Sequence, residues 1–268
     1  MSSAALGLAL GAALLHALWN LLLAGSRDVL AATAVALCAS LIVAAPFAVL
    51  TWGIEREAIP WLLASAVLEC AYFFTLTAAY QRSELSLVYP LARGGAPVLV
   101  LLGALATGVV PTGWETAGVL AVAAGVVLVR GIGGGDRLGV LLGTVIAAQI
   151  AAYTLVDAEG IRHAEPVPYL LFALIPTAVG AALVSGRERL RAELRRTVVL
   201  AGCGGFLAYV LVLAALRLAP AAPVAAVRET SVLFAVVLAA PMLGERVTGM
   251  RLAGAALVVA GIVALGLG

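Results

Sequence analysis

Two stretches of the chain decide its fold: Tyr89-Pro90-Leu91-Ala92-Arg93-Gly94-Gly95-Ala96-Pro97 and Val224-Ala225-Ala226-Val227-Arg228-Glu229-Thr230-Ser231. Each places an arginine inside a run of about twenty otherwise apolar residues. A charge at the bilayer centre costs about 2.5–3.5 kcal/mol on insertion scales, so it is rarely incidental. The prolines and glycines of the first stretch also interrupt regular helix hydrogen bonding. Together the two stretches predict the polar centre of a membrane-embedded site.

The composition is that of an integral membrane protein. Of 268 residues, 64% are hydrophobic and 11% are charged, and the mean hydropathy is +1.15. Soluble domains are about 45–50% apolar and about 25% charged. The formal net charge of +2 is too small and too dispersed to indicate a nucleic-acid partner. Cys38, Cys70 and Cys203 lie in apolar runs without CxxC spacing, so we expect neither a disulfide framework nor a metal site.

Apolar runs long enough to cross the hydrocarbon core, about 20 residues each, fill most of the chain. Ten are found, at residues 4–24, 30–51, 60–81, 85–107, 114–131, 138–157, 167–185, 197–217, 221–243 and 248–267. The connections are short, and a polar linker, residues 131–137, lies at the midpoint. We therefore predict an all-α integral membrane fold of ten transmembrane helices.

The two halves of the chain repeat each other. Arg93 recurs as Arg228 at an offset of 135, and Gly118 and Gly125 recur as Gly254 and Gly261 at an offset of 136. Near-constant offsets predict duplication of a five-helix unit, with residues 1–134 and 135–268 as the two repeats. An odd number of spans inverts the second repeat, and inverted repeats with a site between them are a transporter architecture.

Two GxxxG pairs, Gly7/Gly11 and Gly139/Gly143, predict close helix packing within the repeats, because small residues let helices approach one another.

Arg93 and Arg228 are the first candidate site residues. A guanidinium facing a wet cavity binds a carboxylate or phosphate through two parallel hydrogen bonds. The alternative is that each arginine only neutralises a local carboxylate or caps broken-helix carbonyls, with a role in folding alone.

Two glutamates are the expected counterparts of the arginines. Glu69 lies near the middle of the third run and shares a helix face with Tyr72 and Tyr80. Glu229 adjoins an arginine in sequence, but adjacent helical residues do not face each other. We expect Arg93 to pair with Glu229 or Glu69, and the second arginine with the other. A near-neutral centre suits a zwitterionic substrate. Either glutamate is alternatively a proton-coupling site, or the ion pairs are purely structural.

Further candidates share helix faces or adjoin the arginines: His16, Trp19 and Asn20 on the first run, Gln149 and Tyr153 on the sixth, and Tyr89 and Ser231 beside the arginines. For His16, a helix–helix hydrogen bond is favoured over a titrating switch. Tyr89 equally suits a space-filling role, and Ser231 equally suits a backbone contact. Asp157 shares the face of Gln149 and Tyr153, but we assign it to a solvated loop.

The only basic loop, residues 186–196, has Leu190 and Leu194 one helical turn apart, which predicts a short interfacial helix on lipid headgroups. No HExxH, GxSxG or Walker sequence occurs, and the two histidines lie far apart. We therefore expect no enzymatic activity and no cofactor.

Four segments resemble EamA-type members of the drug/metabolite transporter superfamily in their order and spacing: His16-Ala17-Leu18-Trp19-Asn20, Tyr89-Pro90-Leu91-Ala92-Arg93, Val227-Arg228-Glu229-Thr230-Ser231 and Leu243-Gly244-Glu245-Arg246. The resemblance covers the whole chain as two EamA repeats. It departs at Val109, which stands where the second repeat has Glu245. We therefore expect Glu245 to cap a helix end.

The resemblance implies a bacterial inner-membrane exporter of small polar, amino-acid-like metabolites, working by alternating access through a central cavity. Spans 1, 3, 4, 6, 8 and 9 are expected to line that cavity. The expected partners are a small-molecule substrate and membrane lipid, with coupling to a proton or another ion gradient left open, in a monomer or weak homo-oligomer. One alternative is a multidrug or cation exporter, which the aromatic content of 6% disfavours. Another is a non-transporting lipid-modifying enzyme or scaffold.

The orientation in the membrane is left open by two conflicting indications. The resemblance implies that both termini are cytoplasmic. Loops after odd-numbered spans hold eleven arginines and loops after even-numbered spans hold three, which favours the opposite orientation.

Overall fold

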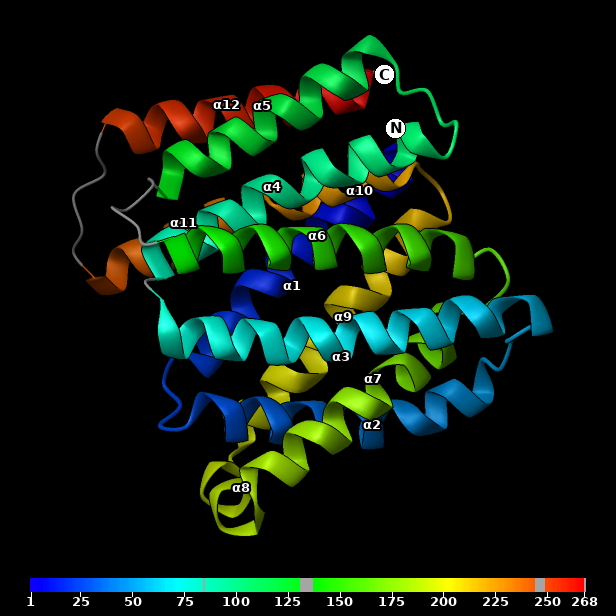
Figure 1. Ribbon diagram of the computed structural model, residues 1–268, viewed down its shortest axis with the longest axis vertical. Helices are drawn as coiled ribbons and strands as arrows, with labels where there is room; N and C mark the ends of the chain where they lie inside the picture. The colour runs from blue at the N-terminus through cyan, green and yellow to red at the C-terminus, as the bar shows by residue number, and fades with distance from the viewer. Residues whose placement is uncertain (84, 131–136, 244–248, 268) are drawn as a thin grey trace.

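The computed structural model describes residues 1–83, 85–130, 137–243 and 249–267, and helices account for the regular secondary structure of these ranges (Figure 1). The helices are, in chain order, α1 (Ser3–Leu23), α2 (Val29–Leu50), the 3-10 helix η1 (Arg56–Ala58), α3 (Ile59–Arg82), α4 (Leu85–Ala106), α5 (Gly113–Arg130), α6 (Arg137–Gly160), α7 (Pro166–Ser185), α8 (Arg187–Glu193), α9 (Arg196–Leu216), α10 (Ala221–Arg228), α11 (Ser231–Leu243) and α12 (Gly249–Leu267). The predicted linker and Glu245 lie outside the described residues.

The membrane-spanning character follows from helix length and composition. Within the described ranges, nine helical segments are long and apolar enough to cross a membrane, and α10 with the start of α11 forms one of them, Ala221–Leu238. A further apolar helix, Gly113–Val129, is shorter. The protein is therefore a multi-pass membrane protein, and the expected count of ten spans stays a prediction.

The fourth predicted run, residues 85–107, forms the single helix α4 with Pro90 and Pro97 inside it, because each proline removes only one backbone donor. The ninth run, predicted as one span over residues 221–243, is corrected, because it is broken at Glu229 and Thr230. Their N–H groups bond to Ala226 and Val227 three residues back, at 3.0 and 3.1 Å, which tightens the chain into a turn.

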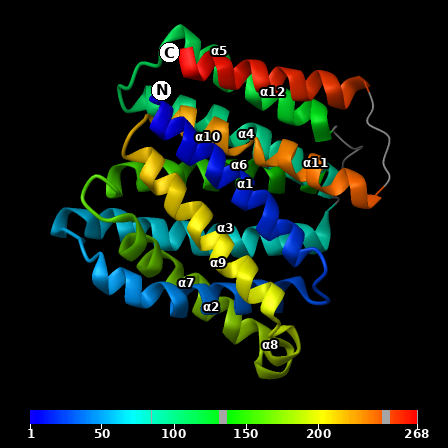
Figure 2. The same ribbon diagram turned by 180° about the vertical axis from the view of Figure 1, so that it is seen from behind.

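Glycines bring α5 and α12 together backbone to backbone. These helices lie side by side in both views (Figures 1 and 2). A Cβ added at Gly118 would lie 2.8 Å from the carbonyl oxygen of Gly261, and one at Gly125 would lie 2.7 Å from that of Gly254. The contacts are reciprocal, because a Cβ at Gly254 or Gly261 would meet the partner carbonyl at 2.8 Å. Only glycine fits such an approach.

The first GxxxG pair, Gly7 and Gly11, does not bring two helices into backbone contact. A Cβ at Gly7 would have nothing within 4 Å, and one at Gly11 would make an ordinary contact of 3.5 Å with Leu211. The prediction of close packing through Gly7 is therefore wrong. In the second pair, Gly143 does approach a neighbouring helix, since its Cβ would lie 2.9 Å from Cβ of Leu91.

The basic loop packs against the protein where α1 ends and α2 begins. Leu190 of α8 packs against a cluster that contains Leu23, Ala32 and Val198, so it does not face lipid as predicted. Glu193 accepts the N–H groups of Arg27 and Asp28, both at 3.0 Å, and Arg195 donates to its other oxygen at 2.5 Å. The α1–α2 loop is thereby linked to α8.

We expect Gly125→Val to destabilise the folded protein by about 1–3 kcal/mol or more, because the added side chain overlaps the α12 backbone. Thermal unfolding of purified protein in detergent measures the loss. Gly7→Val adds the same side chain where space is open and should leave the melting temperature nearly unchanged. Equal melting temperatures for both variants would contradict the packing described for α5 and α12.

A second prediction concerns pH. Burial opposes ionisation of Glu193, but the N–H groups of Asp28 and Arg27 and the Arg195 guanidinium outweigh it, so its pKa lies below the usual value of 4.5. A lowered folded-state pKa adds stability above the unfolded value, and this contribution is lost as pH falls through the folded value. Glu193→Gln should therefore unfold at a lower temperature than wild type at neutral pH. The difference should shrink below about pH 4.5. A difference that is independent of pH would refute this.

Candidate functional site

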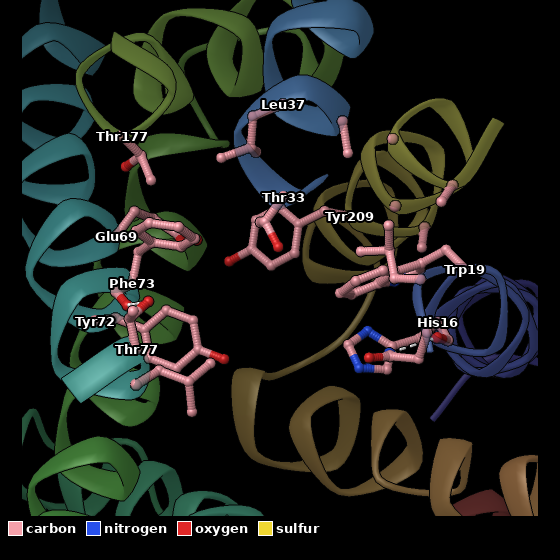
Figure 3. A pocket seen from close by; sticks show the side chains of 18 of the residues that line it. His16, Trp19, Thr33, Leu37, Glu69, Tyr72, Phe73, Thr77, Thr177 and Tyr209 are labelled. Atoms are coloured by element: carbon pink, nitrogen blue, oxygen red, sulfur yellow. Dashed lines mark hydrogen bonds between the residues drawn. The ribbon is translucent and has the colours of Figure 1, made fainter. Parts of the chain in front are cut away.

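A cavity of about 830 Å³ lies between the helices of both halves of the chain. Its wall is formed by α1, α2, α3, α4, α6, α7, α9 and α10. It reaches Arg27 and Asp28 in the α1–α2 loop, at the end of the bundle away from the two termini (Figure 1). Figure 3 shows His16 and Trp19 facing Glu69, Tyr72 and Phe73 across the open space.

Most of the candidate residues lie on this cavity wall. Nine of the twelve line it: His16, Trp19, Asn20, Glu69, Tyr72, Tyr89, Arg93, Tyr153 and Arg228. The structure does not bring the other three to the wall. Gln149 donates instead to Thr75 on α3 at 3.1 Å, Ser231 is buried without a hydrogen-bond partner for its hydroxyl, and Glu229 is held in an ion pair. The side chain of Tyr80 lies outside the described residues.

Arg93 is already neutralised inside the protein. Its Nη1 lies 3.1 Å from Oε1 of Glu229, and the two side chains are only 9% and 2% exposed. Its Nη2 hydrogen-bonds to Nε2 of His16, and its guanidinium carbon lies 5.7 Å from the ring centroid of Tyr89. One of the two predicted pairings is thus present. It joins α4 of the first half to the α10–α11 turn of the second.

Arg228 has no such counter-charge. Its predicted ion pair with Glu69 is not formed, and no carboxylate lies within 4 Å of it in the described part of the chain. Nη2 makes a long hydrogen bond of 3.4 Å to the hydroxyl of Tyr153, and the guanidinium lies 5.3 Å from the ring centroid of Tyr209. Nη1 has no hydrogen-bond partner. This Nη1 atom is buried, so Arg228 is a cation that lines the cavity and whose hydrogen-bonding capacity the described part of the protein does not fill.

Aromatic rings are concentrated at the cavity, although they are sparse in the chain. Phe73, Phe206 and Tyr209 line it beside the four aromatic residues predicted from the sequence. Tyr72 packs edge-on against Tyr153, and Tyr153 against Tyr209, with centroids 5.6 and 6.1 Å apart. Tyr209 lies alone in an apolar run, so no sequence pattern pointed to it.

The assignment of Asp157 to a solvated loop is wrong. Helix α6 continues to Gly160, and Asp157 is fully buried at 0% exposure. Asp157 lies eight residues after Gln149 and four after Tyr153, which places the three on one helix face. This spacing was the signal that could have placed Asp157 inside the helix. Among the described residues, no group of three or more histidine, cysteine, aspartate or glutamate side chains is arranged to hold a metal ion.

Comparison with known proteins adds a family and a fold. Residues 137–267 match the model of the EamA-like transporter family. A protein of known crystal structure aligns with a TM-score of 0.77 and 18% sequence identity, over 100% of this chain and 99% of that chain. It is one of 28 matching chains of solved structures, and at this identity the likeness shows the fold alone. No curated protein matches the chain.

Removing one member of the buried ion pair should be costly. Glu229→Gln leaves the Arg93 guanidinium buried without a counter-charge, which typically costs about 3–5 kcal/mol. The double variant Arg93→Gln, Glu229→Gln should lose less stability than the sum of the single variants. A double-mutant cycle on thermal or denaturant unfolding measures the coupling.

The control for this cycle is the exposed pair of Arg217 and Glu165, whose side chains are 41% and 45% exposed at a distance of 3.0 Å. Its coupling should not exceed about 1 kcal/mol. A buried pair that couples no more strongly than this exposed pair would contradict the geometry of Arg93.

Proposed function

Since this chain belongs, through residues 137–267, to the EamA-like transporter family of the drug/metabolite transporter superfamily, we propose that it is a secondary active transporter of a small polar, amino-acid-like metabolite. It works by alternating access through the central cavity, as an exporter in a bacterial inner membrane. Its partners are the substrate and membrane lipid, and it acts as a monomer or weak homo-oligomer.

Ten spans in two inverted repeats, residues 1–134 and 135–268, form the carrier. Three observations support this arrangement. The family match covers one half of the chain. In the two repeats, α6 corresponds to α1 and α9 corresponds to α3. Helix α1 packs against α9, and α6 packs against α3, so the same pair of helices is in contact after the two halves are interchanged. The contact of Gly118 with Gly261 likewise repeats as that of Gly254 with Gly125.

The unpaired guanidinium of Arg228 carries the proposal. A substrate carboxylate gains most from a cation that has no other counter-charge, and Arg228 lines the cavity without an ion-pair partner in the described part of the chain. Arg93 adds positive potential but shares its charge with Glu229. Glu69 also lines the cavity and is the acceptor for the substrate amine. A cavity wall with one unpaired cation and one carboxylate matches the two charges of a zwitterionic substrate.

The aromatic lining accommodates the apolar part of the substrate. It also favours the second candidate, a multidrug or cation exporter, because aromatic faces attract cations. The two candidates differ in whether the substrate needs a carboxylate.

Alternating access is supported by the unequal ends of the cavity. One end reaches the α1–α2 loop. At the other end, the loop before α3 and the loop before α7 are joined by backbone hydrogen bonds. The N–H of Glu55 donates to the carbonyl of His163 at 3.0 Å, and the N–H of Glu165 donates to that of Gly53 at 2.7 Å. Such paired loops are the kind of contact that must break for the second end to open.

Four related probes test the charge requirement: leucine, leucinamide without the carboxylate, isocaproate without the amine, and isoamylamine with the amine alone. We expect leucine to raise the melting temperature of the purified protein and to drive counterflow in vesicles, because a ligand that binds the folded form stabilises it. Arg228→Gln should weaken leucine binding roughly 10- to 100-fold, the value of a lost charge-assisted hydrogen bond.

Arg56→Gln is the matched control, because it removes the same charge from an exposed position in η1. It should leave leucine binding unchanged. If isoamylamine binds as well as leucine and Arg228→Gln has no effect, the protein is a cation exporter. If no probe is bound or transported, the amino-acid-like substrate class is wrong.

A further inference from the structure

Asp157 is a carboxyl held entirely by hydroxyl groups. Its Oδ1 accepts a hydrogen bond from the Tyr169 hydroxyl of α7 at 3.0 Å, and its Oδ2 accepts one from the Tyr209 hydroxyl of α9 at 2.5 Å. The residue is 0% exposed, and no arginine, lysine or histidine forms an ion pair with it in the described ranges. One carboxyl therefore links three membrane helices without a counter-charge.

The surroundings of Asp157 are shaped to hold this group. A Cβ at Gly160 would lie 2.5 Å from the Tyr169 hydroxyl, so a glycine is needed one turn beyond Asp157. On α3, the Ser65 side chain is 1% exposed, and its Oγ lies close to the Asp157 carboxyl without a hydrogen bond of regular geometry. It is a third hydroxyl on this side of α6, available when the proton content of the carboxyl changes.

The charged groups around Asp157 come from several elements. From α3 comes Glu69, and from α10 comes Arg228, whose guanidinium lies against the face of Tyr209. The nearest cation of α4, Arg93, is neutralised by Glu229. Tyr153 lies one turn earlier on α6 itself. The other charged residues on these elements lie at helix ends: Arg56 and Glu57 of η1, Arg82 of α3, Arg137 of α6 and Arg196 of α9 are exposed, and Glu159 of α6 pairs with Arg162.

Tyr209 connects this carboxyl to the cavity. It lines the cavity wall, and its hydroxyl donates directly to Asp157, which does not line the wall. Figure 3 shows its ring projecting into the open space near Thr33. A single hydroxyl group, that of Tyr209, therefore connects cavity water to the Asp157 carboxyl. The carboxyl itself lies outside the cavity lining.

We propose that Asp157 is the binding site of the coupling proton, loaded from the cavity through Tyr209. The inference rests on the proposed transport function. Tyr209 passes its hydroxyl proton to the Asp157 carboxylate and takes a proton from hydronium in the cavity, which leaves water, an intact tyrosine and a neutral acid. Burial without an ion pair favours this neutral form, whereas the two tyrosine donors and the nearby cation Arg228 stabilise the carboxylate. The two forms are thus balanced against each other.

Proton binding changes the hydrogen bonds between helices. A carboxylate only accepts, so it can hold the Tyr169 and Tyr209 hydroxyls at once, whereas a carboxylic acid must also donate. One of the two tyrosine links then reverses or is exchanged for the Ser65 hydroxyl. Because these links join α6 to α7 and to α9, loading the proton alters the contacts at the end of the bundle away from the cavity mouth.

Infrared difference spectroscopy on reconstituted protein tests this site without any substrate. We expect the carbonyl-stretch band of a buried carboxylic acid to appear as pH falls and to vanish as it rises. Glu69 is a second carboxyl near this site, so the test is made in the Glu69→Gln background. The band should be retained in Glu69→Gln and absent in the double variant Glu69→Gln, Asp157→Asn. A band that survives in the double variant, or Glu69→Gln protein without a titrating band, overturns the proposal. A band that follows sodium concentration at constant pH assigns another ion and overturns it too.

Tyr209→Phe keeps the test decisive if Asp157→Asn does not fold. Losing a donor that stabilises the carboxylate should move the midpoint of the band to higher pH by roughly one unit, a tenfold change in proton affinity. An unmoved midpoint rules out the route through Tyr209. The outcome is separable from the transport function, since leucine counterflow without a titrating Asp157 removes the proton site alone.

Discussion

A guanidinium cannot remain alone in hydrocarbon, and this constraint organises the centre of the protein. Arg93 meets it by pairing with Glu229 across the two halves of the chain. Arg228 meets it through the cavity, where aromatic rings and a tyrosine hydroxyl surround a cation that has no carboxylate beside it. A buried ion pair contributes little net stability. Its effect here is to fix where the α10–α11 turn meets α4 and therefore where the second arginine lies.

Helices α5 and α12 pack away from the cavity. None of their described residues lines it, and the two helices meet through glycines at backbone distance. A close glycine contact also joins two cavity helices, because a Cβ at Gly202 of α9 would overlap the carbonyl oxygen of Ala36 on α2. The hydrogen bonds of Tyr169 and Tyr209 to Asp157 instead join helices through side chains, and such bonds can be exchanged. The carrier we propose would exchange these side-chain contacts while its glycine contacts stay in place.

The sequence predicts the helices and much of the cavity because both depend on simple constraints. Long apolar runs form helices in a membrane, and charges within them must face a partner or water, so Arg93, Arg228 and Glu69 could be selected. The break at Glu229 and Thr230 could not be located, because the prolines of α4 gave the stronger local signal yet leave that helix continuous.

Asp157 and Tyr209 show what was missed and why. Asp157 lies where the apolar run ends, so composition assigned it to solvent, and only its contacts with α7 and α9 reveal that it is buried. Tyr209 owes its role to helices distant in sequence. The proposed site therefore depends on tertiary contacts that no local pattern encodes.

The most direct test of the central claim is a structure of the protein determined with leucine bound. The account predicts the carboxylate within hydrogen-bonding distance of the Arg228 guanidinium, with the ion pair of Arg93 and Glu229 intact. A carboxylate seated on Arg93 with Glu229 displaced, or a ligand bound outside the cavity, would contradict it.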